Sequence, residues 1–203
     1  MGTPANIIGI MGKSKYLPLT TAWIATTGET DTTIINALNT FEASMIANGM
    51  SSDFIAFYPM VGGNSTKHSY NFMNPALYQL TFTGGWTHSA TGALPNGTNA
   101  YANTGINASA VLTQNDNHAS FYSRTNATGA SRACIGSYTG AGTNVYAMQL
   151  RIATNFVTAT NASSSQQATI ANTNSQGFYL MNKVSSAIGG LTLDKNGTQI
   201  AAN

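Results

Sequence analysis

Hydrophobic residues in the first quarter of the chain show a helical period over residues 31–48. Asp31, or Thr30 before it, can cap the first turn of this helix, and Gly49 follows its end. The apolar positions are three or four residues apart, which places them on one helix face: Ile34, Ile35, Leu38, Phe41, Met45 and Ile46. The pattern therefore predicts an amphipathic helix that packs on another element.

After Asp53 the pattern changes to that of β-strands. Apolar and polar residues alternate in short segments that recur at intervals of roughly 8–12 residues, which is typical of an antiparallel sandwich. Asn196-Gly197 is the clearest hairpin signal, because both residues tolerate the positive φ angles of a tight turn. The predicted strands are FIAFYPMV, YQLTFTGGWTHS with a bend at its glycine pair, ASFYSRT, RACIGSY, NVYAMQLRI, NFVTAT, QATIA, GFYLMNKV and GGLTLD.

These patterns predict a mainly β fold with one N-terminal helix and two packed antiparallel sheets. They divide the chain into an arm and helix over residues 1–50 and a β-sandwich over residues 51–203. Residues 1–27 are apolar in places but have no helical or alternating period. Ordering such a segment alone costs roughly 1–2 kcal/mol per residue. We therefore expect it to be extended and to contact other chains, in a homo-oligomer or in a larger assembly.

Composition narrows the classes of function. Only 7% of the 203 residues are charged, against roughly 25% in an ordinary soluble chain, and the net charge is +2. The basic residues are scattered, so no stripe of positive charge predicts a nucleic-acid partner. No apolar run is long enough for a membrane helix. Cys134 is the single cysteine, which excludes an intrachain disulfide, and we expect it to be a small core residue.

No catalytic or metal-binding pattern is found. Glycoside hydrolysis needs two carboxylates roughly 5–10 Å apart across a sugar. The β-region offers Asp53, Asp116 and Asp194, and each is expected in a turn. The three histidines have no short metal-ligand spacing, so we predict no enzyme, no metal and no cofactor.

Sugar binding without catalysis is the chemistry that the residue types favour, because it needs aromatic platforms with amide and hydroxyl groups rather than tuned acids. For the aromatic residues, an ordinary place in the β-core is the alternative. The candidate glycan-binding residues are Trp86, His88, Tyr101, His118, Tyr122 and Arg124.

Several long segments resemble a family of bacteriophage structural proteins, common in phages of Bacteroidetes hosts and including crAss-like ones. The segments are WIATTGETDTTIINALNTF, FIAFYPMVGG, NPALYQLTFTGGWTHSATGALPNGTNAYANTGINASAVL, HASFYSRTNAT, GFYLMNKVSSA and LTLDKNGTQIA. The resemblance covers nearly all of the chain after about residue 20. It implies a concanavalin A-like (lectin/glucanase, LamG-like) jelly roll behind an N-terminal helix. Members continue beyond the final hairpin, so the jelly roll is expected to be incomplete at its C-terminus.

The resemblance implies a virion component, made in the host cytoplasm and carried on the surface of the phage particle. A fibre, spike or decoration protein that contacts other virion proteins and host-surface carbohydrate is the favoured interpretation. Because phage fibres and spikes commonly form trimers, the resemblance also favours a trimer as the homo-oligomer. The alternatives are a glycan-degrading depolymerase of the same fold and a structural head or collar protein with no receptor.

Overall fold

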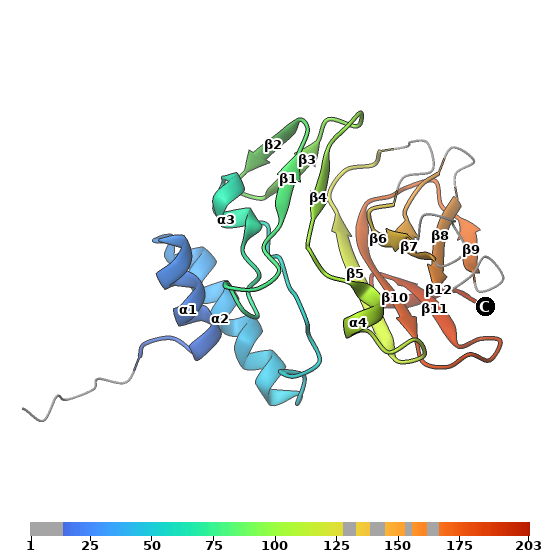
Figure 1. Cartoon of the computed structure of the whole chain (residues 1–203), viewed down its shortest axis with the longest axis horizontal. Helices are drawn as coiled ribbons and strands as arrows, with labels where there is room; N and C mark the ends of the chain where they lie inside the picture. Colours follow the sequence, from blue (N-terminus) through green and yellow to red (C-terminus); the bar gives the residue numbers. More distant parts are fainter. Residues whose placement is uncertain (1–13, 128–132, 139–144, 153–155, 162–166) are drawn as a thin grey trace, which may run out of the picture. The chain divides into compact units, whose positions relative to one another are not determined.

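The structure is a computed structural model in which two compact units are present, Met1–Ile106 and Asn107–Asn203 (Figure 1). We call them the N-terminal and C-terminal units. The sequence patterns place a division at residue 50, whereas residues 51–106 pack with the helices. The reason is that aromatic residues after position 50 complete the helices' core. The structure describes residues 14–127, 133–138, 145–152, 156–161 and 167–203.

The predicted helix is confirmed as α2, Thr32–Ala47. Its N-cap is Asp31, whose carboxylate accepts a hydrogen bond from the backbone N–H of Thr33 at 2.8 Å. The helix buries one face, as the spacing predicts. The buried residues are Ile35, Leu38, Glu42 and Met45.

Residues 18–27 are helical, so the prediction of an extended segment is wrong there. Helix α1 spans Pro18–Thr27, with Pro18 in its first turn and Gly28 in the left-handed conformation at its end. Trp23, on this helix, is fully buried. The helix has no marked apolar period, and its first N–H groups are bound by a residue of α2. The rest of the predicted arm, residues 1–13, lies outside the described residues.

One aromatic-rich core holds the N-terminal unit together. Trp23, Leu38, Met45 and Phe72 are buried in it, and the partly buried Phe41, Phe54 and Phe57 pack against them. Residues 54–61 were expected to form a strand, but no strand occurs there and Met60 has a φ of 53°. The segment instead bonds to a buried amide, since the Phe57 N–H donates to Asn71 Oδ1 at 3.0 Å.

Short elements complete the N-terminal unit. Two antiparallel ribbons form, β1 with β4 and β2 with β3. The predicted bend at Gly84-Gly85 separates β1 from β2, and Gly84 has a φ of 78°. The elements are α3 (Ser65–Ser69), β1 (Thr81–Thr83), β2 (Trp86–Ser89), β3 (Gly92–Pro95) and β4 (Tyr101–Asn103).

The C-terminal unit is built of antiparallel strands. One sheet has the order β12-β11-β10-β5 and the other the order β6-β7-β8-β9 (Figure 1). A single helical turn, α4 (Ala108–Val111), precedes them. The strands are β5 (Asn117–Ser123), β6 (Ile135–Tyr138), β7 (Val145–Gln149), β8 (Phe156–Asn161), β9 (Gln167–Ala171), β10 (Gly177–Lys183), β11 (Leu191–Lys195) and β12 (Thr198–Ala202).

Both sheets contribute side chains to one buried core. Met148 and Val157 come from the second sheet, and Tyr179, Met181 and Leu193 from the first. The prediction of a mainly β fold with antiparallel sheets is therefore confirmed. Each sheet is largely a meander of consecutive strands, with β5 added beside β10. Cys134, expected in the core, is exposed.

The predicted hairpin joins β11 to β12. Asn196 and Gly197 have φ angles of 51° and 79°, the positive values that the turn requires. Asn196 also binds the neighbouring strand β10: its N–H donates to the carbonyl of Phe178 at 2.8 Å, and its Oδ1 accepts the N–H of Phe178 at 2.9 Å. The turn thus fixes the start of β10 as well as its own two strands.

Candidate functional site

The structure divides the six predicted glycan-binding residues between the two units. Trp86, His88 and Tyr101 lie on β2 and β4 in the N-terminal unit. The other three, His118, Tyr122 and Arg124, lie on or just after β5 in the C-terminal unit. The six therefore do not form one site within a single unit. Each group of three has its own surroundings.

The outward side of the β12-β11-β10-β5 sheet brings His118 and Tyr122 together with residues of two more strands. Side chains alternate across the sheet, and Ala119, Tyr179, Met181 and Leu193 face the core. Their sequence neighbours therefore face outward. We define the platform face as the outward residues of β5, β10 and β11: His118, Ser120, Tyr122, Phe178, Leu180, Asn182, Thr192 and Asp194.

Two aromatic residues stand side by side at one end of the platform face. Tyr122 pairs directly with Phe178 in the register of β5 and β10. The Tyr122 side chain is 64% exposed and that of Phe178 is 44% exposed. Directly opposed residues have Cβ atoms about 4.5–5.5 Å apart, so the two aromatic side chains leave the same face of the sheet at neighbouring positions. An exposed aromatic pair of this kind can stack against the apolar face of a sugar ring.

Polar groups occupy the rest of the platform face. Ser120 pairs with Leu180, which in turn pairs with Asp194 on β11. One row further along, His118 pairs with Asn182. Hydroxyl, carboxylate, imidazole and amide groups thus follow the aromatic pair in adjacent rows. This is the combination of donors and acceptors that sugar hydroxyls need.

Arg124 lies beyond the end of β5, on the far side of Tyr122 from this polar area. It is exposed, and its backbone carbonyl accepts a hydrogen bond from Gln176 Nε2 at 3.0 Å. Its position continues the outward alternation of His118, Ser120 and Tyr122. Arg124 is therefore at the margin of the platform face rather than within it.

The three acidic candidates have different surroundings. Asp53 and Asp116 are exposed in turns, as expected. Asp194 was also expected in a turn, but it lies within β11, where its register partner is Leu180. The turn begins two residues later because Lys195 still pairs across the hairpin with Thr198.

Trp86 and His88 belong to an aromatic cluster of the N-terminal unit. Phe82 packs edge-on against both, with ring centroids 5.2 Å from Trp86 and 4.7 Å from His88. The Nδ1 atom of His88 lies 2.9 Å from Nδ1 of His68, which is fully buried. Burial lowers the pKa of His68, and the neighbouring His88 lowers it further, while a backbone hydrogen bond at Ser89 acts in the opposite direction.

This histidine pair holds α3 against β2 and is mainly structural. Two facing Nδ1 atoms can share one proton, with one imidazole donating and the other accepting. Within the described residues, no group of three or more histidine, cysteine or acidic side chains is placed to hold a metal ion. Tyr101, on β4, is 59% exposed and pairs with Thr83, not with Trp86 or His88.

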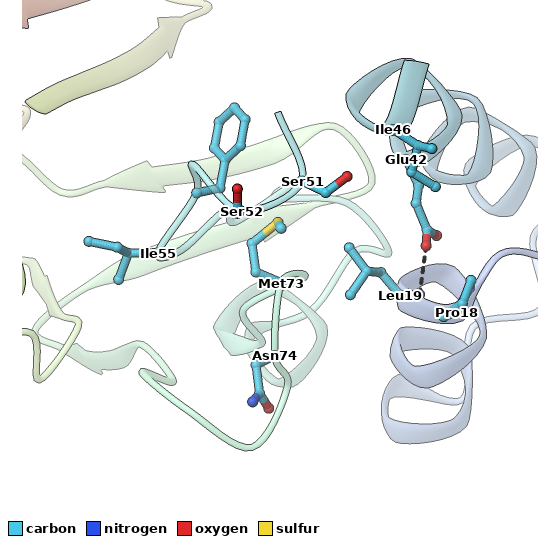
Figure 2. A pocket seen from close by; sticks show the side chains of 10 residues that line it. Pro18, Leu19, Glu42, Ile46, Ser51, Ser52, Ile55, Met73 and Asn74 are labelled. Carbon is cyan, nitrogen blue, oxygen red and sulfur yellow. Dashed lines mark hydrogen bonds between the residues drawn. The ribbon is translucent and has the colours of Figure 1, made fainter. Parts of the chain in front are cut away.

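A hollow of about 380 Å³ lies beside helices α1 and α2, and Figure 2 shows the side chains that line it. Glu42 is the charged residue of this lining. Its carboxylate is already bound, because it accepts hydrogen bonds from the N–H groups of Leu19 and Thr20 at 2.9 and 2.8 Å and from the Thr20 hydroxyl at 2.8 Å. The first of these bonds is the dashed line in Figure 2. Glu42 therefore caps α1 and offers no free acid for chemistry.

Sequence reasoning missed Phe178 and Asn182 as members of the platform face. Both lie in the strand predicted from GFYLMNKV, but that segment is apolar at four consecutive positions, Phe178 to Met181. An uninterrupted apolar run does not show which side of the strand is buried. Pairing with the alternating β5 supplies that information, and only the structure provides it.

Among the described residues, no helix is long and apolar enough to cross a membrane. Comparison with known protein families, with curated proteins and with solved structures finds no match for this chain.

Proposed function

We propose that this chain is a structural protein of a bacteriophage particle, a fibre, spike or decoration component, and that its C-terminal unit binds host-surface glycans on the platform face. The virion assignment rests on the sequence resemblance. The glycan-binding role rests on one observation of the structure, the exposed pair of Tyr122 and Phe178 in direct register on an open sheet. Aromatic rings that remain exposed cost solvation free energy, and such a pair is typical of a recognition surface.

The proposed lectin-like fold builds on the antiparallel sheets of the C-terminal unit. Two antiparallel sheets around one core are the architecture that a concanavalin A-like jelly roll also has. A jelly roll passes repeatedly between its sheets, whereas here the chain changes sheet twice, between β5 and β6 and between β9 and β10. The jelly-roll order therefore remains a proposal drawn from the resemblance. The homo-oligomer, with a trimer favoured, and the position on the surface of the virion are proposals as well.

Binding is favoured over hydrolysis because the platform face offers fewer carboxylates than hydrolysis needs. A glycosidase needs two of them on either side of the scissile bond. Among the outward residues of β5, β10 and β11 that the structure describes, Asp194 is the single acid. The depolymerase alternative would require a second acid supplied from elsewhere.

The test is glycan binding by the full chain and by single alanine variants of Tyr122 and Phe178. Truncating a central aromatic contact costs about 2 kcal/mol, so each variant should bind roughly tenfold or more weakly. Tyr101→Ala is the matched control, because Tyr101 is also a largely exposed tyrosine on a strand but lies in the other unit. Far-UV circular dichroism checks that each variant is folded.

Equal losses in Tyr101→Ala and Tyr122→Ala would show that the platform face is not the binding surface. The absence of binding to any host glycan would favour the structural head or collar protein. Released oligosaccharides on incubation with host capsular polysaccharide would favour the depolymerase. Immunogold labelling of the particle tests the virion assignment independently of glycan binding.

A further inference from the structure

The platform face has a length and a charge distribution that define its ligand more narrowly. The aromatic pair and the row of His118 and Asn182 are separated by four residues along each strand. At about 3.3 Å per residue, this separation is roughly 13 Å. A single sugar ring stacked on Tyr122 and Phe178 cannot also reach the far row. A ligand that uses the whole face must be an extended oligosaccharide that runs along β5 and β10.

The middle row carries a negative charge. Asp194 lies beside Leu180 and Ser120, between the aromatic row and the row of His118 and Asn182. Its side chain is partly buried, which reduces screening by solvent. A carboxylate accepts hydrogen bonds from sugar hydroxyls, and these charge-assisted bonds are stronger than neutral ones. The same carboxylate repels a uronate, sialate or sulfate group placed over the middle row.

The lysine that follows Asp194 in the sequence does not neutralise this charge on the platform face. Lys195 follows Asp194 and therefore points to the opposite side of the sheet. Its ammonium group donates to Asn172 Oδ1 and to the carbonyl of Asn174, and it lies over the ring of the buried Tyr179. Arg124 lies past the aromatic row, on the side away from Asp194. The middle of the face thus keeps its acidic character.

We infer that the platform face binds neutral, extended oligosaccharides, with Asp194 as the residue that selects against anionic sugars. This inference rests on the proposed function. Tyr122 and Phe178 hold one sugar by stacking, Asp194 accepts from hydroxyls of the next, and His118 with Asn182 contacts a third. Affinity should therefore rise from monosaccharide to trisaccharide and then level off.

The test uses an array of neutral and carboxylate-bearing oligosaccharides, from monosaccharides to tetrasaccharides, and the full chain. We expect neutral trisaccharides to bind more tightly than carboxylated ones of the same length. Asp194→Asn keeps the shape of the side chain and removes the charge. It should weaken neutral binding by about tenfold, since a charge-assisted hydrogen bond is lost. It should also narrow the preference for neutral over carboxylated ligands.

Asp53→Asn is the matched control, because it removes the charge of an exposed aspartate in the other unit, and it should leave that preference unchanged. Tight binding of carboxylated glycans by the unmodified chain, or an unchanged preference in Asp194→Asn, would overturn the inference while leaving glycan binding intact. Equal affinity for monosaccharides and trisaccharides would overturn the inference that the ligand is an extended oligosaccharide. No binding to any member of the array would overturn the proposed function and this inference together.

Discussion

Replacement of Glu42 tests whether helix α1 depends on a cap supplied by α2. The Glu42 side chain is 2% exposed, and its carboxylate accepts from Leu19 N, Thr20 N and Thr20 Oγ1. The backbone N–H groups of a first helical turn have no partner within the helix. A carboxylate placed there also interacts favourably with the helix dipole. Glu42 therefore replaces the side-chain cap that Leu17 at the N-cap position does not provide.

The expected loss of stability follows from what each variant removes. Glu42→Ala removes the acceptor for all three donors and leaves the buried Thr20 groups unpaired, so it should lower the free energy of unfolding by about 3–5 kcal/mol. Glu42→Gln keeps one oxygen acceptor and should lose about 2 kcal/mol. Thr20→Val removes the hydroxyl alone and should lose about 1 kcal/mol.

Tryptophan fluorescence during urea unfolding measures these changes in the right part of the chain. The chain contains two tryptophans, Trp23 and Trp86, and both lie in the N-terminal unit. Trp23 is itself on α1 and fully buried. With a urea dependence of about 2 kcal/mol per M, the Glu42→Gln midpoint should fall by about 1 M. Asp31→Asn is the matched control, because asparagine caps a helix as well as aspartate does.

The three variants must follow the order of the contacts that they remove. Midpoints of Glu42→Ala and Glu42→Gln that both lie within error of the parent would refute the capping argument. A fall in the Asp31→Asn midpoint as large as that of Glu42→Gln would also refute it, because removal of any negative charge would then explain the loss of stability. Circular dichroism distinguishes loss of α1 from collapse of the whole unit.

Two further predictions use the same fluorescence assay. The pKa of His68 is lowered in the folded state, so the unfolded chain binds a proton more readily, and this contribution to stability is complete above pH 6.5 and is lost as pH falls through the folded-state pKa. The urea midpoint should therefore drop between pH 7.5 and 5.5, about one unit to each side of the unperturbed pKa. An equal drop in a His68→Gln variant would contradict this explanation. Gly84→Ala should cost about 1–3 kcal/mol, because a Cβ atom would lie 2.5 Å from the carbonyl oxygen of Asn99. Gly28→Ala has a similar φ but open space, and a cost equal to that of Gly84→Ala would refute the steric argument.

Strands were predictable from the sequence where apolar and polar residues alternate within a short segment. The segments from residue 78 onward that were predicted as strands form β1, β2 and β5 to β11, because period-two patterning and turn residues act over a few positions. Helix α1 was not predictable in this way. Its first turn is capped by Glu42, 22 residues after Thr20, and a local sequence pattern does not show such a contact. The strand predicted over residues 54–61 does not form for a related reason. Asn71 Oδ1 accepts the Phe57 N–H, which a neighbouring strand would otherwise have to bind.

The candidate site was predictable in its chemistry but not in its membership. Aromatic, histidine and amide residues were identified from composition and neighbourhood. The sequence could not show that Trp86 and Tyr122 belong to different packing units. Nor could it show that Phe178 stands opposite Tyr122, since that pairing joins strands 56 positions apart in the chain and depends on register.

The Asn196-Gly197 turn, which the sequence predicts most clearly, binds Phe178, one of the two residues that sequence reasoning missed. The Asn196 side chain reaches the backbone of Phe178 because Gly177 has no Cβ, which would lie 2.8 Å from Asn196 Oδ1. Phe178 is therefore bonded through Asn196 on one side and paired with Tyr122 on the other. A binding surface held by a rigid backbone loses less conformational entropy when its ligand arrives. The turn thus does more than reverse the chain, because it fixes half of the aromatic pair on which the proposed recognition depends.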